Sequence, residues 1–425
     1  MKKLIALLLT AIMVFGLVAC ASNTDSSKTN DTTTSTDTQA PADTETKADD
    51  AADEQPAADD QASDAAADDG ENIIIAATVP MTGEPIVSYA TIQGLELAAK
   101  EINEAGGVLG KQLEIAWEDM GTTADVALNA VNKIIARGDV NVHVGINYSS
   151  SALAVEAAVK EAKLPTITGG TSPLLADIDN PYVFRGRTGD KYMINVAMSY
   201  LQDSLGIQEG STIALLYNNN DFGIGALNVL TELCDAANIK LVSEAYNVDD
   251  SDITSQYLKL KQASPDAIIV WSSVNGFPVA SRAIYEQGAD CPVMASSSAS
   301  MQAVIDTCDP WMNGWYSLAD ACMDNPDPEM QAFVKNYTDA YGTETLSFAA
   351  AYAYSWAYVI KDAYERAGTT ENEAFVKALN ETSGVKGLNG TYTRFAEIEM
   401  LNCASVGKIE DGSFVFDKVV DNNAQ

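Results

Sequence analysis

Short hydrophobic runs alternate with amphipathic stretches from Ile73 onward. Runs of this length, rich in β-branched residues and bounded by turn residues, predict buried strands. The near-continuous apolar character of several runs is typical of parallel strands covered on both faces. Four runs lie in the first half of the pattern and four in the second, at residues 73–79, 113–117, 140–146, 165–168, 212–217, 241–248, 267–271 and 292–295.

The stretches between these runs have the apolar spacing of helices. Residues 91–107 and 123–138 both show this spacing, and each pattern stops at a glycine. Two successive sets of strand–helix units predict an α/β fold with two doubly wound, Rossmann-like lobes. The tail is different, because residues 328–367 have a strongly helical pattern and residues 391–420 predict short strands with turns.

The first 20 residues have the pattern of an export signal. Lys2 and Lys3 precede the apolar run 5–19, which is too short for a stable membrane span. The run ends in LVAC, which resembles the bacterial lipoprotein signal, in which the cysteine is acylated and becomes the first mature residue. We therefore expect residues 1–20 to be a lipoprotein signal peptide with lipidation at Cys20. The alternative is an ordinary cleaved signal with a chance cysteine.

Composition and charge separate the next segment from the rest of the chain. Residues 21–70 hold 14 acidic residues and 2 lysines, with no Ile, Leu, Val or aromatic residue. Such a segment cannot bury enough apolar surface to offset its ordering entropy, so 21–71 is predicted to be a disordered acidic linker. The whole chain has a net charge of −35, which disfavours binding to nucleic acid.

Signals for catalysis and for cofactors are weak. The chain contains no GxSxG, GxGxxG or GxxxxGK[ST] motif and no CxxC pair. Its single histidine, His143, lies in the middle of a predicted strand, where a structural role is favoured over a ligand role. We expect no enzyme activity, no cofactor and no metal site. Five cysteines follow the signal, and Cys291 with Cys308 is the first disulfide to test, although the pairing stays open.

In doubly wound sheets, ligands bind at the carboxyl ends of the strands. Six segments follow predicted strands and are rich in Ser, Thr, Gly, Asn or aromatic residues, at 80–90, 146–151, 168–172, 218–223, 271–277 and 295–300. Three serines, Ser149–Ser151, stand at the start of a predicted helix 151–162, where free N–H groups and hydroxyls suit a carboxylate. Simple helix capping is the alternative explanation.

A second hydroxyl-bearing helix start follows the next strand, in TGGTSP (168–173). Gly169 and Gly170 allow the backbone to approach a ligand closely, and Thr171 adds a hydroxyl. Aromatic residues at other strand ends could enclose an apolar ligand, although a core role is equally open for each of them: Tyr89, Phe222 and Trp271.

These segments together are similar to the leucine/isoleucine/valine-type solute-binding proteins of ABC importers. The resemblance rests on the opening from Met81 to Ile115 and on GINYSSSALAV, LPTITGGTSP and NNNDFGIGA, and it covers nearly all of 72–420. It implies a class I periplasmic-binding, Venus-flytrap fold whose lobes are joined by a three-strand hinge. The implied crossovers fall near 188–191, 318–320 and 387–390. Lobe one is then 72–190 with 320–388, and lobe two is 191–319 with 389–425.

The resemblance also implies ligand contacts. The third serine of the loop, Ser151, would hold a ligand carboxylate beside Ser150, and the next loop would contribute Gly169, Gly170 and Thr171. A first-loop tyrosine aligns near Tyr89, and a lobe-two tyrosine aligns with Phe222. Ser297 stands where these binders have a glutamate that pairs the ligand ammonium. Either another carboxylate substitutes, with Glu84, Asp221 and Asp320 as candidates, or the ligand has no ammonium group.

These features together predict a lipid-anchored, extracytoplasmic binding protein of an ABC importer. Its expected partners are an amino acid or a similar small carboxylate or amide, a membrane permease, and the lipid bilayer through acylated Cys20. A sensor for a membrane signalling receptor is an alternative that the sequence does not separate from transport. An exported hydrolase is a third reading, against which the single mid-strand histidine argues.

Overall fold

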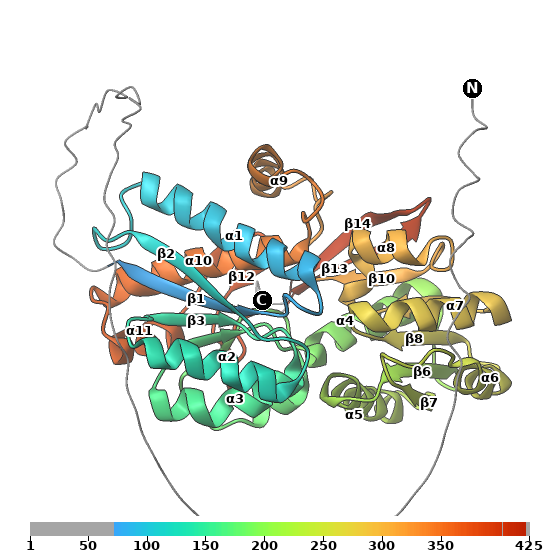
Figure 1. The fold of residues 1–425 in the computed structure, drawn as a ribbon. Helices are drawn as coiled ribbons and strands as arrows, with labels where there is room; N and C mark the ends of the chain where they lie inside the picture. Colours follow the sequence, from blue (N-terminus) through green and yellow to red (C-terminus); the bar gives the residue numbers. More distant parts are fainter. Residues whose placement is uncertain (1–71, 402, 422–425) are drawn as a thin grey trace, which may run out of the picture. The chain divides into compact units, whose positions relative to one another are not determined.

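The computed structural model describes residues 72–401 and 403–421. The predicted signal peptide 1–20, the lipidation site Cys20 and the acidic linker 21–71 lie outside the described residues, so these assignments stay predictions. Figure 1 shows the described body as two lobes, each built around a sheet with helices on both faces.

The first lobe contains a five-stranded parallel sheet with the order β2-β1-β3-β4-β5. Four of its strands are at the predicted positions, and the fifth was not predicted from the sequence. The strands are β1 (Ile73–Val79), β2 (Leu113–Asp119), β3 (Val142–Gly145), β4 (Thr166–Thr168) and β5 (Val183–Arg185). The apolar run of β1 is almost completely buried, as expected for a strand covered on both faces.

Helices cover both faces of this sheet. On one face α1 (Pro85–Glu104) packs against α10 (Phe348–Ala367), and on the other α2 (Ala124–Arg137) packs against α3 (Ser149–Ala162) (Figure 1). The predicted helix 91–107 thus begins six residues earlier, with Pro85 in the first turn. A Cβ added to Gly94 would lie 2.3 Å from the carbonyl oxygen of Ala350, so glycine allows α1 and α10 to approach closely. The remaining elements of this lobe are η1 (Pro173–Asp177), α9 (Pro328–Tyr341) and α11 (Asn372–Asn380).

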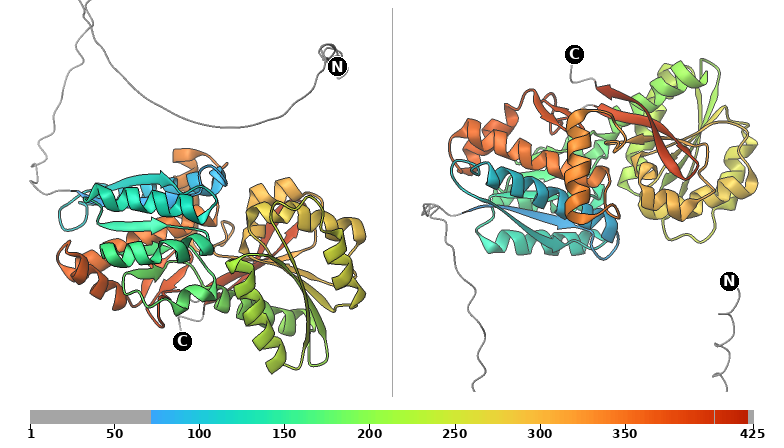
Figure 2. Two further views of the ribbon diagram at one scale, coloured as in Figure 1. Left: turned by 60° about the horizontal axis from the view of Figure 1, so that its bottom comes forward. Right: turned by 90° about the horizontal axis from the view of Figure 1, so that it is seen from above.

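The second lobe contains a seven-stranded sheet with the order β14-β13-β10-β9-β8-β6-β7. Its strands are parallel except that β13 is antiparallel to both of its neighbours. Figure 2 shows helices on both sides of this sheet and the β13–β14 hairpin in red. The strands are β6 (Thr212–Asn218), β7 (Lys240–Tyr246), β8 (Ala267–Trp271), β9 (Val293–Ala295), β10 (Tyr316–Ala319), β13 (Cys403–Glu410) and β14 (Ser413–Asp421).

Two helix layers enclose the second sheet. Helices α4 and α5 bury their apolar residues in one cluster against β6 and β8, and α6, α7 and α8 bury theirs in another. The elements are α4 (Asp190–Leu205), α5 (Asp221–Ala236), α6 (Thr254–Gln262), η2 (Val274–Gly276), α7 (Phe277–Gln287), η3 (Ser297–Ser300) and α8 (Gln302–Cys308). The two-lobed doubly wound α/β fold predicted from the sequence is therefore confirmed.

The chain passes between the lobes close to the first two predicted crossovers, after β5 and after β10. At the third predicted crossover, Gly387 and Gly390 close a small hairpin of β11 (Val385–Gly387) and β12 (Gly390–Tyr392) that packs on α10. The chain joins the seven-stranded sheet only at Cys403. The three crossovers and the lobe boundaries stay predictions.

A buried ion pair lies where the chain leaves the first lobe. Arg185 and Glu399 are 0% and 2% exposed, and Nη1 of Arg185 donates to Oε1 of Glu399 at 2.6 Å. Nη2 donates to the carbonyl oxygen of Ser172 at 2.7 Å. Burial raises the pKa of Glu399, while the charge of Arg185 opposes that rise. The pair therefore fixes the segment before β13 to the loop after β4.

The only histidine has the structural role favoured from its position. His143 is completely buried in β3, and its ring nitrogens lie 3.0 Å from Thr78 Oγ1 and 3.3 Å from Thr166 Oγ1. Burial lowers its pKa to about 3, so the ring stays neutral. No disulfide forms among the five cysteines of the described body, so the disulfide considered between Cys291 and Cys308 is absent there.

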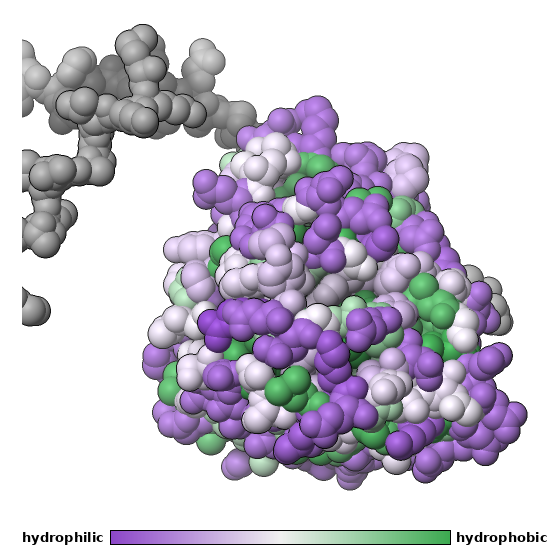
Figure 3. Space-filling model, turned by 90° about the vertical axis from the view of Figure 1, so that its right-hand side faces the viewer, coloured by the Kyte–Doolittle hydropathy of each residue, from purple (hydrophilic) through white to green (hydrophobic). Residues whose placement is uncertain are grey.

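The surface of the body is largely polar. Figure 3 shows one face on which hydrophilic residues predominate and hydrophobic ones occur in small, separate groups. Within residues 72–421, apart from residue 402, no helix is both long enough and apolar enough to cross a bilayer.

Candidate functional site

A cavity of about 520 Å³ lies between the two lobes, at the carboxyl ends of the strands of both sheets. Its volume is within the range of small-molecule sites. Each of the six segments selected by the strand-end rule contributes at least one lining residue, and their role in ligand binding stays a prediction. The lining comprises Glu84, Val87, Thr122, Ala124, Asn147, Tyr148, Ser149, Ser150, Ser151, Thr171, Arg187, Asn220, Phe222, Val248, Asp249, Ser273, Val274, Asn275, Ser297, Ser298, Met301, Phe348 and Tyr352.

The three serines form the first turn of α3, and all three line the cavity. The N-cap residue is Tyr148, whose side chain makes no capping hydrogen bond, so the first N–H groups of the helix have no cap. Ser149 Oγ accepts a hydrogen bond from the backbone N–H of Ser172 at 3.1 Å and thereby joins the two loops. Among the described residues, Ser150 and Ser151 have no side-chain hydrogen bond. Their hydroxyls can therefore bind a ligand.

The loop after β4 places Thr171 in the cavity but keeps its glycines out of the lining. A Cβ on Gly169 would lie 2.4 Å from Oδ1 of Asn147, and one on Gly170 would lie 2.8 Å from Cδ1 of Leu175. The glycines therefore allow close packing of protein groups around the loop. The predicted direct contact of Gly169 and Gly170 with a ligand has no support in the cavity lining.

The three aromatic residues predicted to contact a ligand lie at different places relative to the cavity. Phe222 is half-buried at the start of α5 and lines the cavity. Trp271 is 1% exposed and packs behind Phe222, with 6.0 Å between the ring centroids, so it supports the wall from the core. Tyr89 is 49% exposed on α1 and is not part of the lining. Tyr148 and Tyr352 are the tyrosines that line the cavity.

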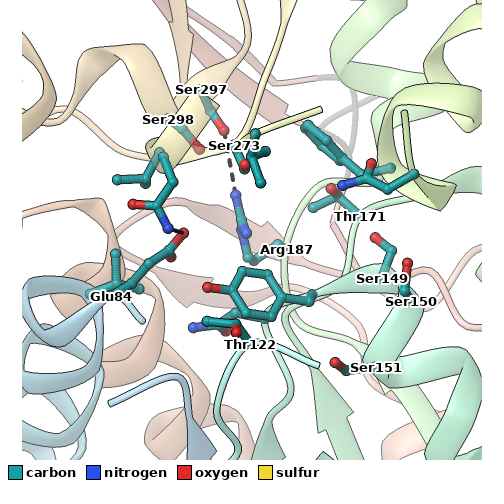
Figure 4. Close-up of a pocket in the computed structure, with 18 of the residues that line it drawn as sticks. Glu84, Thr122, Ser149, Ser150, Ser151, Thr171, Arg187, Ser273, Ser297 and Ser298 are labelled. Atoms are coloured by element: carbon teal, nitrogen blue, oxygen red, sulfur yellow. Dashed lines mark hydrogen bonds between the residues drawn. The ribbon is translucent and has the colours of Figure 1, made fainter. Parts of the chain in front are cut away.

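Arg187, just after β5, carries the positive charge of the cavity and was not predicted. Its Nε and Nη2 donate to the two carboxylate oxygens of Asp320 at 2.8 and 2.7 Å, and Nη1 donates to Gly169 O at 3.1 Å. Nη2 also lies 3.4 Å from Oγ of Ser297 in the second lobe (Figure 4). Burial alone lowers the pKa of Arg187, but the charge and hydrogen bonds of Asp320 outweigh it and raise the pKa above its usual value. The guanidinium is therefore a fixed cation that contacts both lobes.

Glu84 is the buried acid of the cavity. It is 7% exposed at the N-cap of α1, and Asn275 Nδ2 of the second lobe donates to its Oε1 at 3.5 Å. Burial raises its pKa to about 7, although a hydrogen bond with Tyr148 and the charge of Arg187 lower it in part. Of the three acids considered as substitutes for the missing glutamate, Glu84 lines the cavity, whereas Asp221 and Asp320 do not.

These groups divide the cavity into regions of different chemistry. Figure 4 shows Ser149, Ser150 and Thr171 on one side, Glu84 on the other, and Arg187 between them. Hydroxyl and N–H donors at the start of α3 suit a carboxylate, since helix N-termini bind anions. Apolar side chains from both lobes complete the wall and suit an aliphatic or aromatic group, namely Val87, Phe222, Val248, Val274, Met301 and Phe348.

Several lining residues escaped the sequence analysis for identifiable reasons. Arg187 follows β5, a strand that was not predicted because only the short helix η1 separates it from β4. Phe348 and Tyr352 lie on α10, more than 150 residues after the first-lobe strands, so no strand-end rule could place them. Tyr148 stands directly before the three serines and could have been found from its position.

The fold and the cavity define a two-lobed α/β binding protein. The family model described as periplasmic binding protein matches residues 72–413, and the chain belongs to this family. It is 24% identical over 327 residues to the Leu/Ile/Val-binding protein homolog 1 of Brucella suis, covering 75% of this chain and 85% of that protein.

Two solved structures show the same fold. One is a leucine binding protein from Thermotoga maritima, with a TM-score of 0.75, 22% identity, and coverage of 83% of this chain and 100% of that chain. The other is a fatty acid ABC transporter substrate-binding protein from Thermomonospora curvata, with a TM-score of 0.75, 19% identity, and coverage of 83% and 93%. At these identities the likeness shows the fold alone, and the class of ligand depends on the residues that line the cavity.

Proposed function

We propose that this protein is the extracytoplasmic, lipid-anchored solute receptor of an ABC importer. It captures an amino acid, branched-chain or related, or a similar small carboxylate or amide between its lobes and delivers it to a membrane permease. It performs no chemistry on the ligand. The family, the amino-acid names of the relatives and the export signal support this proposal.

The observation that carries the ligand class is the uncapped start of α3 in the cavity. Ser150 and Ser151 supply hydroxyl donors, the first turn supplies N–H groups, and Thr171 adds a hydroxyl from the neighbouring loop. A carboxylate is the small group that best fits several convergent donors. The similar proteins named for leucine and for fatty acids also share a carboxylate in their named ligands.

The lipid anchor rests on the sequence of the first 20 residues. Two or three acyl chains on Cys20 would hold the protein firmly at a membrane, since each buried CH2 contributes about 0.8 kcal/mol. Globomycin, which blocks lipoprotein signal cleavage, should retain the precursor, and Cys20→Ala should release the protein from the membrane fraction. An unchanged membrane fraction for Cys20→Ala would contradict the anchor.

Calorimetry tests the ligand class. The purified protein is titrated with the L-amino acids, with ω-amino acids, and with short carboxylates and amides. We expect saturable heat with at least one amino acid. Heat with none of these compounds would refute the proposed function.

A matched pair of variants tests the carboxylate contact. Ser151→Ala removes a hydrogen bond to a charged group, which is worth about 1.5–3 kcal/mol, so the Kd should rise roughly 10- to 100-fold. Ser204→Ala, at an exposed position of α4, is the control and should leave the Kd unchanged. If Ser151→Ala binds as tightly as the parent protein, Ser151 does not hold the carboxylate.

A further inference from the structure

The part of the cavity next to Ser297 already contains a positive charge, the guanidinium of Arg187. Nη2 of Arg187 lies 3.4 Å from Ser297 Oγ, and the guanidinium packs over the rings of Phe348 and Tyr352 at 5.5 and 5.3 Å. Asp320, which pairs with Arg187, does not line the cavity. The ligand space therefore meets the guanidinium and not its counter-ion, and a second cation placed there would be repelled.

Glu84, unlike Arg187, is a buried charged group that forms no ion pair with a described residue. The ion pairs found among the described residues include none that involves Glu84. Its polar neighbours are the hydroxyl of Tyr148 and the amide of Asn275, which are both neutral. The charge of Arg187 affects the pKa of Glu84, but Nε and Nη2 of Arg187 both donate to the carboxylate of Asp320. A buried carboxylate in this position is stabilised by an added cation.

We propose that Glu84 binds the ammonium group of an amino-acid ligand, an inference that rests on the proposed function. The carboxylate end of the ligand lies at α3 and Thr171, and the ammonium end lies against Glu84 instead of Ser297. The ammonium supplies the positive charge that Glu84 lacks and avoids Arg187, which lies between Glu84 on one side and Ser149 and Ser150 on the other (Figure 4). Glu84 is thus a specificity-determining residue that separates amino acids from carboxylates without an ammonium group.

Asn275 extends this contact to the second lobe. It lies in η2, and its amide reaches Oε1 of Glu84 at 3.5 Å across the cavity. One carboxylate oxygen can accept from Asn275 while the other accepts from the ligand. The carboxylate of Glu84 would then contact both the ligand and the second lobe.

The protonation of Glu84 gives the inference a pH signature. The groups that face it are Tyr148 before α3, Arg187 after β5, Asn275 in η2 and Tyr352 on α10. Because its pKa is about 7 without ligand, an ammonium must displace a proton below that pH. Affinity for the amino acid should therefore fall as the pH drops from 7.5 to 5.5, by up to tenfold per pH unit. A ligand without an ammonium group should not show this loss.

Calorimetry with matched ligands tests the inference. The probes are the amino acid that binds most tightly in the panel and the 2-hydroxy acid with the same side chain, which for leucine is 2-hydroxy-4-methylpentanoate. We expect Glu84→Gln to weaken the amino acid at least 10-fold, to change the 2-hydroxy acid less than 3-fold, and to abolish the pH dependence. Glu84→Asp keeps the charge and should retain part of the preference. Glu104→Gln, an exposed acid on the same helix, controls for net charge.

The outcomes separate this inference from the proposed function. Equal weakening of both ligands by Glu84→Gln, or no weakening of the amino acid, would overturn the role of Glu84 while leaving the proposed function intact. Binding only of carboxylates or amides without an ammonium group would overturn it in the same way. Binding of no compound in the panel would remove the proposed function and the inference together. Unfolding curves of each variant establish that it is folded.

Discussion

Replacing Glu399 with glutamine should strongly destabilise the protein. The substitution removes the negative half of a pair in which both side chains are almost completely buried and the N–O distance is 2.6 Å. Arg185 keeps its charge and retains the carbonyl oxygen of Ser172 as an acceptor. Its Nε is already a buried donor without a hydrogen-bond partner, so the environment has little capacity to compensate.

The magnitude follows from the uncompensated charge. Removing one partner of a buried ion pair costs about 3–5 kcal/mol. A glutamine oxygen can still accept one hydrogen bond from Arg185, so we expect about 3 kcal/mol. Since folded proteins are stable by about 5–15 kcal/mol, this loss is a large fraction of the total.

Urea unfolding followed by far-ultraviolet circular dichroism measures this loss. The midpoint should fall with little change in the slope, because the surface exposed on unfolding is the same. Glu397→Gln is the control, since that acid is exposed two residues away and should change stability by less than about 0.5 kcal/mol. The double variant Arg185→Met/Glu399→Leu removes both charges and should recover most of the stability. A loss below about 1 kcal/mol in Glu399→Gln, or no recovery in the double variant, would refute the reasoning.

Three further predictions concern other parts of the molecule. Gly94→Ala should lower the thermal midpoint, because its Cβ would lie 2.3 Å from the Ala350 carbonyl oxygen. Gly106→Ala is the control: its Cβ meets open space, and its positive φ should lower the free energy of unfolding by only about 1 kcal/mol. Without ligand, burial raises the pKa of Glu84 from 4.5 to about 7. The free energy of unfolding of the wild-type protein should therefore fall relative to that of Glu84→Gln by about 3 kcal/mol as the pH rises from 5 to 8. Equal pH dependence of the two free energies would contradict this prediction. Dithiothreitol should leave the midpoint unchanged, because no disulfide forms among the described cysteines, and a shift would indicate a disulfide.

The strand pattern could be predicted because buried parallel strands leave a strong local signal. All eight predicted runs overlap strands of the structure, and β1 and β8 have the predicted bounds. The short strand β5 was missed because only the short helix η1 separates it from β4, so no alternation of strand and amphipathic helix marks it. The third crossover stays a prediction, since Gly387 and Gly390 close a hairpin and the chain joins the seven-stranded sheet only at Cys403.

The site was predicted in part for the same reason. Loops that follow strands in sequence also meet at one edge of the sheet, so Ser150, Ser151, Thr171, Phe222 and Ser297 could be brought together from order alone, and all five line the cavity. Their roles as ligand contacts stay predictions. Tyr89 lies outside the lining because its direction depends on the rotation of α1 about its axis, which a strand-end rule does not give.

The interleaving of the two lobes along the chain has a consequence for biosynthesis. The first sheet is complete at Arg185, but its covering helix α10 begins only at Phe348, and the second sheet still lacks β13 and β14 until Asp421. A growing chain therefore cannot close either hydrophobic core before nearly its whole length has been synthesised. Late completion of both cores delays the point at which the nascent polypeptide can fold stably.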